Sequence, residues 1–210
     1  MYVVTADQKH SRTAADRVPA LLADLQLRTR TGTGTTRPFE RTAGDEVQGL
    51  LDDPAVVVDV VVTLLRGGWW VGIGVGAVER PLPDTARAGR GPAYLAARQA
   101  VESAKAAPAG ICVSGGEGAG RAEAAAWLLA TLLARRTAQG WQVVDLVSQG
   151  AKGVEAAAKL GISPQAVSSR LRVAGWAEEQ RGRELMAWLL GQADLADRSA
   201  GEPQTREDAR

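Results

Sequence analysis

The segment from Gly153 to Arg172, GVEAAAKLGISPQAVSSRLR, restricts the possible folds of this chain more than any other stretch. Ala157 precedes Gly161 by four residues, and Val167 follows the glycine by six. Two short helices that cross closely need a small residue at the contact, a turn residue that accepts positive φ, and an apolar side chain from the second helix. The spacing therefore predicts a helix-turn-helix over this segment.

The sequence also predicts where the second helix begins. Ser163 is a suitable N-cap, and Pro164 suits the first helical position, where its missing N–H costs nothing. We expect this helix to run from Pro164 to Val173, with polar side chains on its outer face. Amides, hydroxyls and guanidinium groups of this kind reach the base edges and phosphates of duplex DNA. The candidate DNA-binding residues are Ser163, Gln165, Ser168, Ser169, Arg170 and Arg172.

Two other interpretations of the segment stay open. Helix–Gly–helix pairs that only pack against each other are common, and sigma-factor-like modules use the same pattern to contact polymerase as well as promoter. We favour double-stranded DNA because the cap, the small residue, the glycine and the apolar residue all occur at the required offsets. A net charge of +1 on 210 residues argues against coating of a nucleic acid, but it permits a local DNA-reading face.

Composition places the chain among globular proteins, because 45% of its residues are hydrophobic and a core can form without staples. Cys112 is the single cysteine, which excludes an intramolecular disulfide and a cysteine-based zinc site. Its apolar neighbours predict a buried, reduced thiol and a cytoplasmic protein. The first residues do not read as a signal peptide. The longest apolar run, Ala55–Leu65, is interrupted by Asp59 and is too short to cross a bilayer.

The first part of the chain alternates between strand and helix patterns. We expect strands at Tyr2–Thr5, Phe39–Thr42, Glu46–Leu51, Trp69–Val78 and Gly110–Ser114, and helices at Thr13–Leu27, Pro54–Leu65 and Pro92–Lys105. This order predicts an α+β fold, a ferredoxin-like α/β sandwich with an antiparallel sheet and helices on one face.

Glycine alternates with β-branched residues in the strand from Trp69 to Val78. One face of that strand is therefore bare backbone, which lets a helix or a ligand approach closely. The glycines lack the spacing of a phosphate-binding loop, so we favour the packing interpretation.

A glycine-rich break at Gly115–Gly120 predicts a domain boundary. We expect an α+β domain over residues 1–116 and an all-α helix-turn-helix domain over residues 117–192. The helices expected there, besides the pair described above, are Arg121–Ala138, Trp141–Ser148 and Gly175–Leu190. Residues 193–210 are polar and are expected to be a disordered tail.

Two carboxylates occupy notable positions in the first domain. Asp7 follows the first predicted strand, and Asp45 lies at the tip between the two hairpin strands. Those two strand ends can meet in such a sheet, and paired carboxylates there could hold Mg²⁺ with a nucleotide. Both residues are equally well explained as ordinary turn or helix-cap residues.

At these residues the domain resembles class III nucleotide cyclases and, more distantly, GGDEF domains. The cyclase pattern is matched by Asp7, by Gly44–Asp45 and by Arg98 on a late helix. It departs from the pattern at Tyr94, which stands where the family has its transition-state asparagine, and at Arg41 and Arg87, which replace base-reading residues. The resemblance thus implies a cyclase-like domain without cyclase activity and without catalytic residues, in which Asp7, Asp45 and Arg98 are the possible metal or nucleotide ligands.

Three further segments resemble the SatD family. They are Ala6–Arg12, Gly44–Leu50 and Gly91–Arg98, and some members also carry a C-terminal helix-turn-helix. The resemblance implies a bacterial cytoplasmic protein that is often described as DNA-binding. We therefore expect a transcriptional regulator, not an enzyme, whose first domain acts as a sensor or dimerisation unit in a homodimer. The alternatives are a metal-dependent phosphoryl-transfer enzyme using Asp7 and Asp45, and a protein-interaction adaptor.

Overall fold

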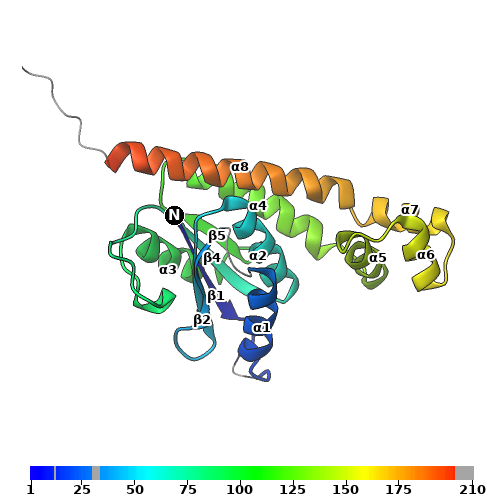
Figure 1. The fold of residues 1–210 in the computed structure, drawn as a ribbon, viewed down its shortest axis with the longest axis horizontal. Coiled ribbons are helices and arrows are strands. Elements are labelled where there is room, and N and C mark those ends of the chain that lie inside the picture. The colour runs from blue at the N-terminus through cyan, green and yellow to red at the C-terminus, as the bar shows by residue number, and fades with distance from the viewer. Residues whose placement is uncertain (12, 30–33, 202–210) are drawn as a thin grey trace, which may run out of the picture.

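The computed structural model describes residues 1–11, 13–29 and 34–201 and has a mixed α+β fold (Figure 1). Arg12 and residues 30–33 and 202–210, on which parts of the predictions fall, lie outside the described residues. The strands are β1 (Tyr2–Gln8), β2 (Thr35–Arg41), β3 (Glu46–Leu51), β4 (Trp69–Val75) and β5 (Ile111–Ser114). The helices are α1 (Val18–Arg28), α2 (Pro54–Arg66), the 3₁₀ turn η1 (Ala86–Ala88), α3 (Pro92–Ala104), α4 (Ala119–Ala134), α5 (Ala138–Ser148), α6 (Gly153–Leu160), α7 (Pro164–Val173) and α8 (Trp176–Gly201).

The five strands form one sheet in the order β2-β3-β1-β4-β5. Neighbouring strands are antiparallel except for β4 and β5, which are parallel. The expectation of a wholly antiparallel sheet was therefore wrong at its last strand. The reason is that α3 crosses over between β4 and β5 and returns the chain to the same end of the sheet.

Helices cover both faces of the sheet, so the expectation of helices on one face was also wrong. The glycines of β4 explain why. A Cβ at Gly72 would lie 2.2 Å from the backbone nitrogen of Val101, and one at Gly74 would lie 2.0 Å from the carbonyl oxygen of Ala93. Both contacts are to α3, so the bare face of β4 lets this helix lie directly on the strand. The predicted packing role of these glycines is confirmed.

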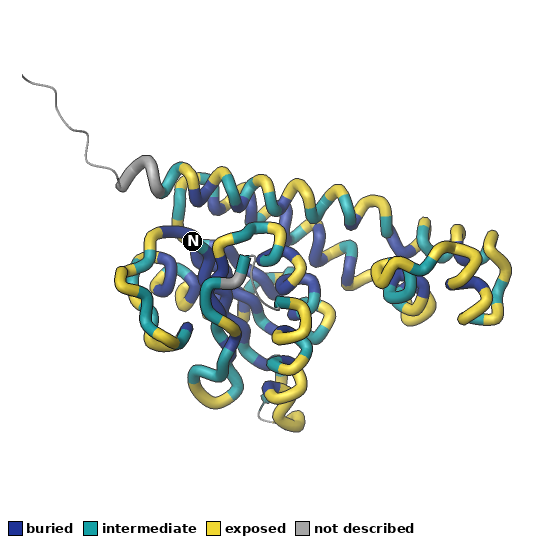
Figure 2. The backbone as a smooth tube through the Cα atoms, in the orientation of Figure 1, coloured by how far each residue is buried: buried dark blue, intermediate teal, exposed yellow. Residues whose placement is uncertain are grey.

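The opposite face of the sheet shares one apolar core with α2, α4 and α8. Ile73 of β4, Leu129 of α4 and Leu190 of α8 are all buried in it. The break at Gly115–Gly120 therefore does not separate two cores, and α4 and α8 belong to the body of the sheet. Only α5, α6 and α7 extend beyond this body, as a lobe at one end of the molecule (Figures 1 and 2).

Helix α8 is longer than its sequence pattern predicted. It has 26 residues, which corresponds to about 39 Å at the usual rise, and it reaches Gly201 rather than ending near Leu190. Ala193 is buried in the core, and the Asp194 carboxylate forms an ion pair with the N-terminal amine. The expectation of a disordered tail was thus wrong for residues 193–201, because tertiary contacts hold this polar segment in place.

Several predicted helix ends moved. Helix α1 begins at Val18 rather than near Thr13; its N-cap residue, Arg17, makes no side-chain cap hydrogen bond, and Asp16 just before it accepts a hydrogen bond from the Val18 N–H at 3.0 Å. The predicted helix Arg121–Ala138 ends early, at Ala134, and α5 begins at Ala138, where the Thr137 hydroxyl accepts from the Gly140 N–H at 3.1 Å.

Two further predictions concern the interior and the membrane. Cys112 is buried as expected, and burial raises the pKa of its thiol to about 11. Within the described ranges, no helix combines the length and the apolar character that crossing a bilayer requires.

Candidate nucleic-acid interface

The lobe begins with α6, whose two ends are fixed by local hydrogen bonds. At its start, the Glu155 carboxylate accepts from the backbone N–H of Lys152 at 3.0 Å. At its end, Gly161 has a φ of 65°, the left-handed conformation that glycine adopts without strain. This turn lets the Ile162 N–H donate to the Ala157 carbonyl at 3.1 Å, so the chain reverses within a few residues.

Helix α7 starts as the sequence indicated. The Ser163 hydroxyl accepts from the Ala166 N–H at 3.2 Å, and Pro164 occupies the first turn. The helix covers Pro164–Val173, the range that was predicted. Two short helices joined by a three-residue turn therefore occupy the candidate segment.

A third helix completes the lobe. Val143 of α5, Ala157 of α6 and Val167 of α7 are buried in one small apolar cluster. Ala157 is 4% exposed and Val167 is 1% exposed, so the small residue and the apolar residue both lie at the crossing, where they were expected. The partly buried side chains around this cluster are Leu146, Val147, Leu160, Ile162 and Leu171.

One face of α7 carries exposed polar side chains. Four of the candidate residues line a shallow depression of about 370 Å³ together with Pro164: Gln165, Ser168, Ser169 and Arg172. Ser163 is exposed too, but its hydroxyl oxygen is used as the cap. Arg170 is half-buried and does not line this depression, and it lies three residues after the buried Val167 and four before the buried Ala174. Among the described residues, neither Arg170 nor Arg172 forms an ion pair with a carboxylate.

A buried arginine attaches the lobe to the body. Arg136, just after α4, donates to Glu179 in α8 at 2.7 Å, and the two side chains are 0% and 1% exposed. Arg136 also donates from Nε to the carbonyl oxygen of Ala174 at 3.0 Å, at the end of α7. Its guanidinium lies over the Trp141 ring, 4.4 Å from the ring centre. One side chain therefore links α4, α5, α7 and α8.

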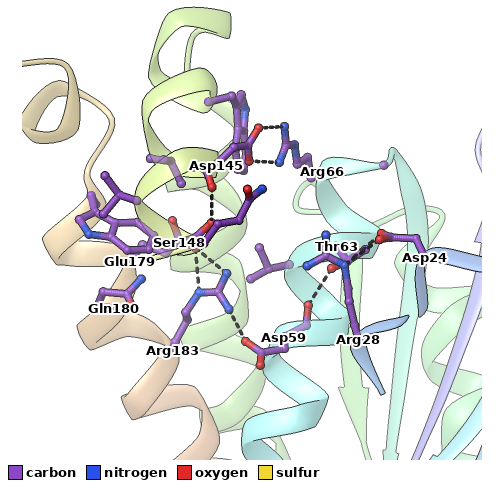
Figure 3. A pocket seen from close by; sticks show the side chains of 17 residues that line it. Asp24, Arg28, Asp59, Thr63, Arg66, Asp145, Ser148, Glu179, Gln180 and Arg183 are labelled. Atoms are coloured by element: carbon purple, nitrogen blue, oxygen red, sulfur yellow. Dashed lines mark hydrogen bonds and ion pairs between the residues drawn. The ribbon is translucent and has the colours of Figure 1, made fainter. Parts of the chain in front are cut away.

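Two further ion pairs line the groove between the lobe and the body, and one of them joins the two parts (Figure 3). This groove has a volume of about 880 Å³. Arg66 of α2 donates to Asp145 of α5 at 2.7 Å, and Arg183 of α8 donates to Asp59 of α2 at 2.6 Å. Sequence reasoning missed all these pairs, because their partners lie far apart in the chain and no local pattern joins them.

The paired carboxylates lie close together, but a lysine accompanies them. Asp7 lies inside β1 rather than after it and is paired in register with Glu46 of β3. The Lys105 ammonium lies 2.8 Å from its carboxylate. Burial raises the pKa of Asp7 above its usual value, and the nearby Asp45 adds to this shift. The ion pair with Lys105 opposes it. A hydrogen bond from Ser11 lowers the pKa of Asp45.

This arrangement does not fit a divalent metal site. Mg²⁺ prefers several oxygen ligands, and here one of the two carboxylates already neutralises an ammonium group. No cluster of three or more potential metal ligands of the His, Cys, Asp or Glu type exists among the described residues. Among the described residues, Arg98 forms no ion pair with Asp7 or Asp45. It is exposed and lines a separate cavity of about 740 Å³ with Arg87, Arg90 and Tyr94.

Comparison of this chain with protein-family models, with curated proteins and with solved structures gives no match. The geometry described above therefore carries the functional argument.

Proposed function

We propose that this protein binds double-stranded DNA through α6 and α7, used as a helix-turn-helix, and that it acts as a transcriptional regulator. The observation that carries the proposal is the exposed face of α7. Gln165, Ser168, Ser169 and Arg172 share that face, and the half-buried Arg170 lies on the same helix outside it. An amide and a guanidinium can each form two hydrogen bonds with a base edge, and a second guanidinium on the same helix can contact phosphate.

The shape of the lobe supports the same function. Helix α7 has 10 residues and is therefore about 15 Å long, while the major groove is about 12 Å wide and admits one helix. The lobe lies at one end of the molecule, away from the sheet, so a duplex can approach α7 without meeting the body (Figure 1). The three helices share their own apolar cluster, which keeps α7 rigid when it is inserted.

The body is proposed to be a ferredoxin-like, cyclase-related sandwich that serves as a sensor or dimerisation unit. The strand order β2-β3-β1-β4 and the antiparallel pairing of these four strands support that assignment. The same order is compatible with the resemblance to cyclases. The pairing of Asp7 with Lys105 speaks against a phosphoryl-transfer role, because the carboxylate is already neutralised.

A homodimer is the expected DNA-binding form, since one helix-turn-helix makes few contacts and two-fold dimers commonly read two half-sites. Both faces of the sheet carry helices, which leaves the outer side of α4 and α8 as the candidate interface. These two helices pack against each other and expose four large apolar side chains: Leu128, Leu185, Trp188 and Leu195. Exposed apolar surface of this kind marks interaction sites.

The test is capture of genomic DNA fragments by the purified full chain, followed by affinity measurements on the enriched sequence. The triple variant Gln165→Ala, Arg170→Ala and Arg172→Ala should lose this binding, while circular dichroism shows an unchanged helix content. Arg121→Ala is the matched control, because it removes an exposed arginine in the first turn of α4, outside the lobe. Unchanged affinity in the triple variant would exclude α7 as the reading helix and would favour the protein-adaptor alternative.

A further inference from the structure

A further cavity, separate from the α7 face, collects positive charge. It has a volume of about 490 Å³ and lies where the C-terminal ends of α2 and α4 meet the start of α5. Lys9, Arg66, Arg135 and Arg136 line it, and no aspartate or glutamate does. Its remaining walls are mostly small or apolar, with Pro108, Ala109, Ala130, Thr131, Ala134 and Trp141 among them.

The charge in this cavity is only partly neutralised by the protein itself. Asp145 pairs with Arg66 and Glu179 pairs with Arg136, both from outside the cavity. Two helix C-termini face the same region, and their dipoles together supply about one negative charge. Lys9 and Arg135 have no ion-pair partner among the described residues. Positive charge therefore remains in excess in the cavity, even after the negative ends of the two helix dipoles are counted.

One donor in the cavity lining is both buried and unused. Arg136 directs Nε to the Ala174 carbonyl and Nη2 to Glu179, but its Nη1 is buried without a hydrogen-bond partner. A buried donor left unpaired costs roughly 1–3 kcal/mol. Lys9 is half-buried and has no carboxylate partner among the described residues: its Nζ lies over the Trp70 ring, 4.0 Å from the ring centre, and burial lowers the pKa of its amine. Both groups would gain from an anion.

We propose that this cavity binds a small molecule that carries a phosphate group. A phosphate dianion offers several oxygens at once to Lys9 and Arg135, and to Nη1 of the buried Arg136 once the guanidinium turns toward the cavity, which a single carboxylate cannot do as completely. Pro108, Ala109 and Ala130 would accommodate a short, weakly polar remainder of the ligand. The volume lies within the range of small-molecule sites, about 300–1,000 Å³.

The site also has a direct connection to the candidate DNA-reading helix. Arg136 holds the Ala174 carbonyl, which is the residue that follows α7. A ligand that draws the guanidinium toward the cavity competes with that hydrogen bond and so acts on the end of α7. This consequence for DNA rests on the proposed function, whereas the ligand site itself does not.

The binding test uses calorimetry on the full chain with inorganic phosphate and glycerol 3-phosphate, at an ionic strength held constant with chloride. Arg135→Ala and Lys9→Ala should each weaken phosphate binding by about tenfold or more. Arg121→Ala, at the opposite end of α4, should leave it unchanged. Absence of phosphate binding at millimolar concentration, equal loss in the control, or equally tight binding of succinate would overturn the proposal.

A second measurement locates the ligand without relying on affinity. The chain has lysines only at positions 9, 105, 152 and 159, so acetylation can be followed at each by mass spectrometry. Phosphate should suppress labelling of Lys9 and leave Lys152 and Lys159 unaffected, and the protection should disappear in Arg135→Ala. Labelling of Lys9 that ignores saturating phosphate would contradict the site. Both measurements are made without DNA, so a failure of the proposed DNA binding would not affect them.

Discussion

Arg136 donates a hydrogen bond to Glu179 at 2.7 Å, and both side chains are almost completely withdrawn from solvent. The pair joins the end of α4 to the first turns of α8, and Arg136 continues to the end of α7 through Ala174. Arg183 donates to the second carboxylate oxygen of Glu179 at 2.7 Å, so this carboxylate serves two guanidinium groups. One buried acidic residue therefore holds both guanidinium groups, including the Arg136 side chain that contacts the lobe.

Replacing Glu179 with alanine should destabilise the protein by about 3–5 kcal/mol, because the change leaves a buried guanidinium without its counter-charge. Guanidinium-chloride unfolding followed by circular dichroism measures the loss. Glu178→Ala, the exposed neighbour, is the control and should stay close to the wild type. The double variant Arg136→Met with Glu179→Leu should recover most of the stability; a double variant as unstable as Glu179→Ala would contradict this account.

Gly161→Ala should cost about 1–2 kcal/mol, because an L-residue is strained in the left-handed conformation. The cost is purely a backbone effect, since a Cβ at Gly161 would meet no atom within 4 Å. Gly153→Ala provides the comparison, because it has the same open surroundings but lies in the first turn of α6 without a positive φ. That variant should be neutral or slightly stabilised. Equal effects at the two glycines in thermal unfolding would refute the argument.

Arg172→Ala and Arg170→Ala should affect DNA binding differently if α7 lies in the major groove. Arg172 lies on the exposed face beside Gln165, so its loss should cost about 1–3 kcal/mol and relax the preference at one base pair. Arg170 is half-buried and lies outside that face, so its loss should weaken binding to all sequences similarly and reduce the salt dependence by about one phosphate contact. Fluorescence anisotropy at several salt concentrations, on matched and scrambled duplexes, separates the two. The assignment fails if both variants lose the same amount on every duplex.

Asp7 and Asp45 should have opposite effects on the pH dependence of stability. Burial raises the pKa of Asp7, so the folded state holds its proton more tightly, and ionised Asp7 reduces stability as pH rises above 3.8 through the folded pKa. Asp7→Asn should therefore gain stability relative to the wild type over that range. The lowered pKa of Asp45 has the reverse sign: its contribution is present above 3.8 and is lost as pH falls.

Urea unfolding of wild type, Asp7→Asn and Asp45→Asn between pH 3 and pH 7 tests this pair. Asp45→Asn should be the less stable variant at neutral pH, and its deficit should shrink in acid. If Asp7→Asn instead loses stability relative to the wild type on going from acid to neutral pH, the ion pair with Lys105 outweighs burial.

The proposed dimer should separate when its apolar surface is charged. Leu185→Glu or Trp188→Glu replaces a side chain that is 49% or 60% exposed, so folding should be retained while association is lost. Multi-angle light scattering at micromolar concentration measures the mass. Leu95→Glu is the control, because Leu95 is 72% exposed on α3, away from this surface. A monomeric wild type, or a variant that keeps the dimer, would exclude α4 and α8 as the interface.

Local patterns determined the elements that depend on neighbouring residues. The bounds of α7 and β3 agree with the sequence prediction because Ser163 and Pro164 start the helix and Gly44 turns the chain ahead of the strand. The glycine alternation in β4 likewise predicted a close helix, because the absence of a Cβ acts at that position whatever lies elsewhere. These interactions span only a few residues, or depend on the size of a single side chain, so the sequence alone was sufficient.

Tertiary structure decided the features that join distant parts of the chain. No local pattern shows that α8 continues to Gly201, because its last turns are polar and are held by the burial of Ala193 and by the ion pair of Asp194 with the N-terminus. Nor does any spacing bring Arg136 to Glu179, or Lys9 into one cavity with Arg135, since each contact requires the sheet and helices to be assembled first. Electrostatic partners are chosen by proximity in space, and that proximity is fixed by the apolar core rather than by sequence separation.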